Sequence, residues 1–146
     1  MKNNKYYRVY AEINLDAIVK NVDNLMALTK ENTGALAVVK ADGYGHGDVA
    51  VAKAVAQKVT GYAVATLDEA VNLRENGVKK PILVLGYVDP YEFDILVSHE
   101  ITATVFDVET AQLLADAARV QKKQAHCHIK VDTGMRRIGL EPDENG

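Results

Sequence analysis

Hydrophobic and polar positions alternate along the chain in a pattern that predicts five short strands separated by helices. The strand-like apolar segments are Ala35–Lys40, Tyr62–Ala65, Ile82–Leu85, Thr102–Val105 and His128–Asp132. Between them, apolar residues recur at helical spacing behind residue types that favour helix N-termini. A strand followed by a helix, repeated several times, is typical of parallel βαβ units.

Helix boundaries are marked by capping residues and by glycine or proline. Asn14 precedes an apolar stripe that continues through Lys30, and Asp48 precedes an Ala- and Val-rich segment that ends near Lys58. Three further helices are expected after Thr66, Asp89-Pro90 and Asp107, the first ending at Asn76-Gly77 and the second near Ser98. Thr66 and Glu69 have the spacing of a capping box, in which the two side chains each accept a hydrogen bond from a free backbone N–H.

Five parallel strands can belong to an open, doubly wound sheet or to a closed barrel. A closed (β/α)₈ barrel takes about 250 residues, whereas this chain has 146. Length alone therefore favours the open sheet. In both arrangements ligands bind at the carboxyl ends of the strands.

Composition and charge exclude several function classes. Hydrophobic residues make up 48% and charged residues 25% of the chain, which is ordinary for a globular domain. A net charge of −3 gives no basic surface for nucleic acid, and no apolar run approaches the roughly 18 residues of a membrane span. Met1–Tyr7 has no apolar segment behind its lysines, unlike a signal peptide. The lone Cys127 has no partner for an internal disulfide, which agrees with a cytoplasmic location.

The candidate chemistry lies at the end of the first predicted strand. Apolar residues run from Ala35 straight into Lys40, and glycines then alternate with Tyr44 and His46. The unbroken apolar run predicts a strand buried on both faces. Burial disfavours the charged form of a lysine and frees its amine for Schiff-base chemistry, whereas a lysine that extends to solvent needs no such role. The glycines let the backbone approach a ligand closely, and His46 is expected to shape their turn.

The segment Ala37–Gly47, with the sequence AVVKADGYGHG, resembles the pyridoxal-phosphate (PLP) signature of the alanine racemase family. The segment Lys130–Gly139, KVDTGMRRIG, also resembles the family, and the resemblance covers nearly the whole chain in order and spacing. It implies that Lys40 holds PLP as an internal aldimine and acts as a catalytic base, and that Tyr44 hydrogen-bonds the phosphate. It further implies that Arg137 contacts the phenolic oxygen of PLP and orients the substrate carboxylate.

The same resemblance implies a fold and a reaction. The fold is the N-terminal part, about five βα units, of a PLP-binding TIM-type (β/α)₈ barrel, with the rest of the barrel and a C-terminal β domain absent from residues 1–146. The reaction is the interconversion of L-alanine and D-alanine for peptidoglycan, in a cytoplasmic homodimer. Lys40 is then one of two bases. The second is a tyrosine of the partner subunit's C-terminal domain that this chain does not match, so the isolated chain is expected to be inactive or weakly active.

Some candidate residues keep two interpretations. Lys130 is expected inside the fifth strand, where the resemblance implies a carbamylated lysine that holds Arg137 in place; the alternative is a side chain that extends out of the barrel. Arg136 stands where the family often has a small residue, so a surface role for it and an exchange of roles with Arg137 both stay open. His126 and His128 alternate with Cys127, yet no further ligand has suitable spacing and no metal is expected.

Two other functions share the PLP-binding lysine. One is a PLP-binding homeostasis protein without racemase activity, although its motif lacks the full Gly-Tyr-Gly-His-Gly run. The other is the racemase domain of a membrane-bound serine or alanine racemase, for which this chain shows no membrane segment. Substrate preference between alanine and serine stays open at this stage.

Overall fold

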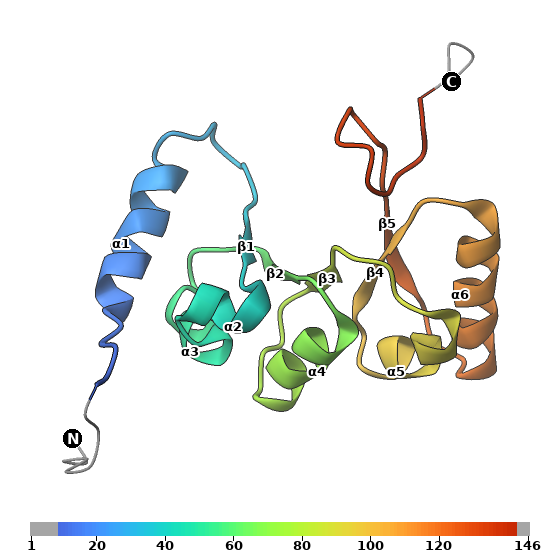
Figure 1. Cartoon of the computed structure of the whole chain (residues 1–146), viewed down its shortest axis with the longest axis horizontal. Coiled ribbons are helices and arrows are strands. Elements are labelled where there is room, and N and C mark those ends of the chain that lie inside the picture. The colour runs from blue at the N-terminus through green and yellow to red at the C-terminus, as the bar shows by residue number, and fades with distance from the viewer. Residues whose placement is uncertain (1–8, 143–146) are drawn as a thin grey trace.

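The computed structural model describes residues 9–142 as five strands joined by helices (Figure 1). The expectation for Met1–Tyr7 lies outside the described residues. The strands are β1 (Leu36–Val38), β2 (Gly61–Val64), β3 (Ile82–Val84), β4 (Thr102–Val105) and β5 (His126–Ile129). They pair in chain order from β1 to β5, and every pair is parallel. The sequence therefore predicted the number of strands and their parallel pairing correctly.

The strand order distinguishes a barrel sector from an open doubly wound sheet. In a doubly wound sheet the order reverses at a switch point, whereas here each strand lies beside the one before it. The helices that follow the strands lie on one side of the strip of strands (Figure 1), as in the helical ring of a (β/α) barrel. The open sheet favoured by chain length is therefore wrong, and the barrel arrangement implied by the resemblance is confirmed.

Except for α3, the expected helices begin where their capping residues predict. They are α1 (Leu15–Met26), α3 (Asp48–Ala54), α4 (Leu67–Glu75), α5 (Phe93–Ser98) with a preceding 3₁₀ turn η1 (Pro90–Glu92), and α6 (Val108–Val120). The Asn14 side chain accepts from the Ala17 N–H at 3.0 Å, and Asp107 accepts from the Thr110 N–H at 2.7 Å. The predicted capping box at α4 is also present. A short turn labelled α2 (Lys40–Gly45) is described with the site.

Three predicted helix boundaries are wrong for local reasons. Helix α1 ends at Met26 rather than Lys30, and the chain then turns through Asn32, whose φ is 66°. Asp48 is the first residue of α3 and not its cap, since Gly47 occupies the cap position without a side-chain hydrogen bond. Helix α3 also ends at Ala54, four residues before Lys58, and residues 55–58 form non-helical turns.

The fifth strand is shifted relative to its predicted position. It spans His126–Ile129, whereas the sequence predicts His128–Asp132. Lys130 donates its backbone N–H to the Val105 carbonyl at 2.8 Å and lies just beyond the strand. Asp132 follows it, so both polar side chains lie past the carboxyl end of β5 and not within the sheet. The prediction that Lys130 lies inside the strand is therefore wrong.

The core lies between the central strands and the helices that cover them. Strands β2 and β3 are buried at every position. The largest fully buried side chains include Tyr62, Leu73, Ile82, Phe93 and Leu96. Tyr62 donates its hydroxyl to the Ala52 carbonyl at 2.6 Å, which ties β2 to α3, and burial raises the pKa of Tyr62.

The outer strands are exposed. Leu36 and Val38 of β1 are 40% and 42% exposed, and every residue of β5 is exposed. Within the described residues β1 pairs only with β2, and β5 pairs only with β4. The prediction that β1 is buried on both faces is therefore wrong for this chain. No helix among residues 9–142 combines the length and apolar character needed to cross a membrane.

Candidate functional site

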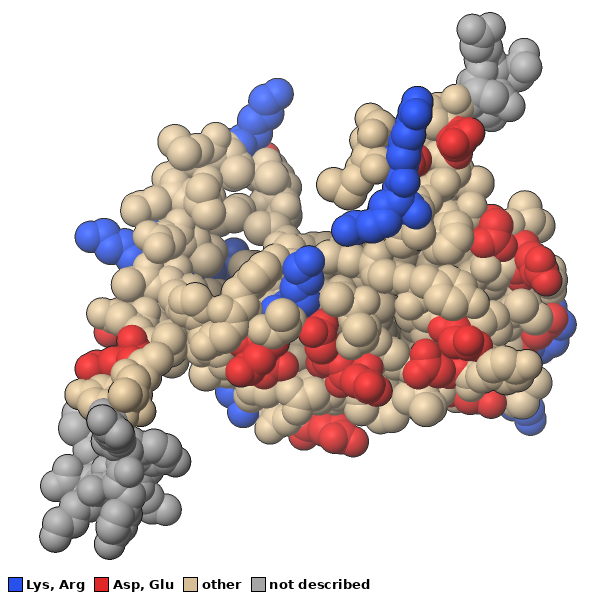
Figure 2. Space-filling view, in the orientation of Figure 1, with Lys and Arg blue, Asp and Glu red and all other residues tan. Residues whose placement is uncertain are grey.

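A cavity of about 300 Å³ lies at the carboxyl ends of the strands. Its lining brings together residues from four parts of the chain, namely Lys40, Ala65, Leu85, Gly86, Tyr87, Arg137 and Ile138. Lys40 follows β1, and Arg137 belongs to the segment beyond β5. In Figure 2, basic side chains border the notch on this side of the molecule, whereas acidic side chains gather over the helices below it. The structure thus brings together the two charged residues that the sequence placed after the first and fifth strands.

The charges of this cavity favour an anionic ligand. Lys40 and Arg137 are the charged residues of its lining, and no Asp or Glu lines it. A guanidinium can bind a planar anion through two N–H groups, whereas an ammonium acts as a compact point charge. The amine of Lys40 is also a nucleophile when it is deprotonated. The arrangement can therefore hold an anion and form a covalent bond to a carbonyl compound.

The chain forms a left-handed turn directly after Lys40. Ala41, Asp42, Gly43 and Tyr44 have φ values between 51° and 60° and ψ values between 38° and 53°. The Gly43 N–H donates to the Val39 carbonyl at 2.9 Å and closes the turn. Left-handed geometry costs about 1–2 kcal/mol for each residue with a Cβ. The surrounding structure must hold such a turn in place.

Two aspartates tie the left-handed turn to α3 and α4. Asp42 accepts from the Asp48 N–H at 3.1 Å, and its own carbonyl accepts from the Gly47 N–H at 2.8 Å. The buried Asp48 carboxylate in turn accepts from the Asn72 side-chain amide at 2.8 Å. From the sequence only a capping role was expected for Asp48, because its contact with Asn72 spans 24 positions.

Tyr44 and His46 differ in their surroundings: Tyr44 is exposed, whereas the His46 ring contacts the backbone of the glycine turn. Tyr44 is 59% exposed and is not among the residues that line the cavity of Lys40 and Arg137. Nδ1 of His46 lies 3.1 Å from the carbonyl oxygens of both Gly43 and Tyr44. These contacts agree with the expected role of His46 in shaping the glycine turn.

Asp132 organises the loop that carries the two arginines. Its Oδ1 accepts from the N–H groups of Gly134 at 2.8 Å and Arg136 at 3.0 Å. These bonds, first that from Arg136 and then that from Gly134, lower the pKa of Asp132. Backbone bonds from Leu140 to Lys130 and from Asp132 to Leu140, both 2.8 Å, close the loop at its base.

The loop directs its two arginines to different places. Arg137 lines the cavity that contains Lys40. Arg136 has a left-handed φ of 53° and lines a separate depression of about 510 Å³ with Asp132 and Glu141. The structure thus separates two neighbours that the sequence could not distinguish. Lys130 is half-buried at the base of this loop.

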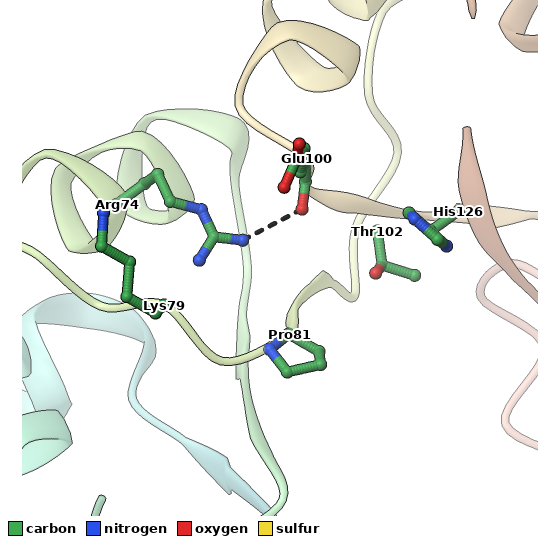
Figure 3. Close-up of a pocket in the computed structure, with 6 residues that line it drawn as sticks. All are labelled: Arg74, Lys79, Pro81, Glu100, Thr102 and His126. Atoms are coloured by element: carbon green, nitrogen blue, oxygen red, sulfur yellow. Dashed lines mark hydrogen bonds between the residues drawn. The ribbon is translucent and has the colours of Figure 1, made fainter. Parts of the chain in front are cut away.

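A second cavity, of about 190 Å³, lies at the opposite, amino-terminal ends of the strands. Arg74 lines it and donates to the carbonyls of Val78, Lys80, His99 and Glu100 at 2.7–3.0 Å. Figure 3 shows the bond to Glu100. Burial lowers the pKa of Arg74, and the charge of Glu100 partly offsets this effect. These four acceptors occupy the guanidinium, so Arg74 joins loops at the face where barrel residues serve stability.

The histidines of β5 have no metal-like surroundings. His126 and His128 are exposed, and Cys127 between them is exposed too. Among residues 9–142, no group of three or more His, Cys, Asp or Glu side chains is placed to hold a metal ion.

Comparisons with known proteins agree on one family. The family model described as "Alanine racemase, N-terminal domain" matches residues 13–145. Alanine racemase 1 of Oceanobacillus iheyensis is 43% identical over 145 residues, which cover 99% of this chain and 39% of that protein. The solved alanine racemase of Clostridium difficile 630 has a TM-score of 0.92 and 42% identity, over 96% of this chain and 37% of that one.

A solved histidine racemase from Leuconostoc mesenteroides subsp. sake is also similar. Its TM-score is 0.80 and its identity 30%, over 87% of this chain and 34% of that one. The chain spans about two fifths of the length of the curated relatives that it matches.

Proposed function

This chain belongs to the alanine racemase family, and on that premise we propose that the protein interconverts L-alanine and D-alanine with PLP as its cofactor. In this proposal residues 1–146 form the N-terminal portion of the PLP-binding barrel domain. Completion of the barrel and a C-terminal β domain belong to the proposal as well, as do a cytoplasmic location, a homodimer and a role in supplying D-alanine for peptidoglycan. The family is generally PLP-dependent.

The observation that carries the proposal is the cavity shared by Lys40 and Arg137. PLP is an anionic aldehyde with a phosphate group, and it needs an amine for covalent attachment and cations around its charged oxygens. The cavity offers both, and no acidic residue lines it. Its volume of about 300 Å³ falls at the lower end of the range for small-molecule sites. The residues present therefore fit this cofactor.

Each site residue has a defined task in this proposal. Lys40 would hold the cofactor through its amine; once the substrate amine replaces it on the cofactor, the freed Lys40 amine would move the proton of the substrate α-carbon on one face. When bound, PLP supplies an electron-withdrawing ring that stabilises the negative charge left at that carbon. The Tyr44 hydroxyl donates to the phosphate. Arg137 binds the phenolic oxygen of the cofactor and orients the substrate carboxylate, because its guanidinium is planar and always charged.

Lys130 supports Arg137 in this proposal. Carbamylation would convert its cation into an anion, which would attract the guanidinium instead of repelling it. Lys130 is half-buried at the base of the loop that carries Arg137, and the Leu140 N–H donates to its carbonyl. In this proposal a carbamylated Lys130 would stabilise the loop by attracting the Arg137 guanidinium.

The substrate assignment favours alanine. The curated relatives with 42–46% identity to this chain are named alanine racemase. The histidine racemase is 30% identical, which lies between the solved alanine racemases of Oenococcus oeni at 29% and Streptomyces coelicolor at 31%. A solved relative from Bacillus anthracis is described with bound L-Ala-P. Alanine, serine and histidine are accordingly the substrates to compare.

A racemisation assay on the intact protein that carries this chain tests the proposal. Each of the three amino acids is offered as a pure enantiomer with PLP, and the opposite enantiomer is measured by chiral chromatography. Alanine should turn over fastest, and Lys40→Ala should lower the rate by at least about 10²–10⁴-fold because a general base is lost. Lys53→Ala, which removes an exposed lysine of α3, is the control. No racemisation of any of them, or full activity in Lys40→Ala, would contradict the proposal.

A further inference from the structure

The carboxylate of Glu69 joins the carboxyl ends of β1 and β2. Its Oε1 accepts a hydrogen bond from the Ala41 N–H at 2.7 Å, and its Oε2 accepts one from the Ala65 N–H at 2.7 Å. Ala41 follows Lys40 directly, and Ala65 lines the same cavity as Lys40. One side chain of α4 thus holds the backbone on two sides of the proposed site.

Helix capping explains only part of this arrangement. The capping box requires Glu69 to accept from the Thr66 N–H, and that bond is the longest of the three at 3.4 Å. The two short bonds go to backbone groups outside α4. Hydrogen bonds from N–H groups to a carboxylate are shorter and about twice as strong as neutral ones. The geometry of Glu69 therefore serves the strand ends more than the helix.

The bond to Ala41 falls in the left-handed turn, where the backbone conformation is unfavourable for residues with a Cβ. Ala41 is the first residue of the left-handed turn, with φ 51° and ψ 53°. Glu69 holds the N–H of this residue, while Asn72, one turn further along α4, holds Asp48 and through it Asp42. Residues three apart lie on one face of a helix. Two residues on one face of α4, Glu69 and Asn72, thus hold the left-handed turn through hydrogen bonds.

We propose that Glu69 is a positioning residue, which sets the place of the Lys40 amine in the cavity by holding the left-handed turn. The backbone at Ala41 sets the direction in which the Lys40 side chain leaves the chain, so a displaced turn would also displace the amine. The catalytic consequence rests on the proposed function, whereas the effect on the turn does not. Sequence analysis gave Glu69 only its capping role, because Ala41 lies 28 positions away.

Three variants of the intact protein separate this role from helix capping. Glu69→Gln keeps the length of the side chain but turns an NH₂ group toward one of the two N–H donors. Glu69→Asp keeps the charge but is too short to hold both strand ends. Asp68→Asn is the matched control, because it removes a charge from the same first turn of α4 and Asp68 is exposed.

Hydrogen exchange measured without PLP tests the effect on the turn. Peptides that cover residues 40–45 should exchange about tenfold faster or more in Glu69→Gln and Glu69→Asp, because a bond to a charged group is lost. Peptides from β3 and α6 should keep their wild-type rates, and Asp68→Asn should match wild type throughout. Unchanged exchange at 40–45 in both Glu69 variants would overturn the proposal, as would equal acceleration over the whole protein.

Selective reactivity and kinetics test the effect on Lys40. Acylation of Lys40 relative to Lys53, followed by mass spectrometry, should change at least about threefold in the Glu69 variants and not in Asp68→Asn. In the racemisation assay kcat should fall about tenfold or more while KM changes little, as expected when a reacting group is misplaced. A reactivity ratio equal to wild type would overturn the proposal. If wild type itself does not racemise, the proposed function fails, while exchange and acylation still decide the role of Glu69.

Discussion

The ammonium of Lys40 lies over the ring of Tyr44, 5.9 Å from its centroid. The left-handed turn between these residues brings them together, since its φ values stay positive from Ala41 to Tyr44. A cation over an aromatic ring gains about 0.5–1 kcal/mol at an exposed site, and Tyr44 is 59% exposed. The proposed attachment point and the proposed phosphate donor are therefore in contact within one turn of the chain.

Covalent attachment should be confined to Lys40. PLP added to the purified protein and reduced with borohydride should label the peptide that contains Lys40, and Lys40→Ala should lose the visible absorbance of the lysine adduct. The reason is that Lys40 is the lysine that lines the cavity at the carboxyl ends of the strands. Lys53→Ala should keep both label and absorbance. Peptide mapping that finds the label on another lysine would remove Lys40 from the proposed site.

Loss of the Tyr44 hydroxyl should weaken cofactor binding. A hydrogen bond to a charged phosphate is worth about 1.5–3 kcal/mol, so Tyr44→Phe should raise the Kd for PLP by about tenfold or more. Titration of PLP followed by absorbance measures this change. Tyr91→Phe is the control, because Tyr91 is 95% exposed and belongs to η1, outside the left-handed turn that carries Tyr44. Equal affinity in Tyr44→Phe and wild type would contradict the phosphate role.

The two neighbouring arginines should differ in their effect on turnover. Arg137→Ala should lower kcat/KM for alanine about 100-fold, since Arg137 lines the cavity and would contact substrate. Arg136→Ala should change it less than about threefold, because Arg136 lines a different depression. Steady-state kinetics of both variants make the comparison. The opposite order of effects would exchange the roles of the two residues.

The Asp132 turn should depend on an acceptor atom and not on charge alone. Both of its backbone bonds end on Oδ1, so Asp132→Asn should keep the turn while Asp132→Ala opens it. Hydrogen exchange over residues 133–137 should rise about tenfold in Asp132→Ala and by a smaller factor in Asp132→Asn, which keeps the acceptor atom but loses the charge. Similar exchange in the two variants would show that the bonds to Gly134 and Arg136 do not hold the loop.

Protonation of the Asp132 carboxylate should destabilise the loop in strong acid but not at mildly acidic pH. Because the backbone N–H groups lower the pKa of Asp132, the charged form is favoured in the fold. Its contribution to stability is then fully present above the pKa of an unfolded aspartate and is lost as the pH falls through the lowered pKa. Exchange over residues 133–137 should therefore stay protected at mildly acidic pH and rise only in stronger acid. Loss of protection near neutral pH, after correction for the intrinsic pH dependence of amide exchange, would contradict this assignment.

The 146-residue chain by itself should not racemise alanine at an enzymatic rate. Lys40 is the only one of the two proposed bases in this chain, and one general acid–base group contributes about 10²–10⁴-fold. Strand β5 pairs only with β4 among the described residues and is exposed at every position, and such edges pair with other chains. Light scattering should therefore show self-association. A fully active monomer of this length would contradict both expectations.

The sequence determined the features that depend on neighbouring residues. Asn14, Thr66 and Asp107 cap their helices as predicted, because each accepts from a backbone N–H three positions away. The strands also form where short apolar runs predict them, with ends shifted by one to three residues at all but β4. Even the motif around Lys40 was evident, since its residue types and spacing are contained within eleven positions.

Only the tertiary structure decided how these parts meet. The strand order, the left-handed turn after Lys40 and the separation of Arg137 from Arg136 all depend on contacts between distant segments. Glu69 shows the reason most directly: one oxygen completes a local helix cap, while the other binds Ala41, 28 positions earlier. Local spacing reveals the first contact. The second exists only because parallel strands place their carboxyl ends side by side.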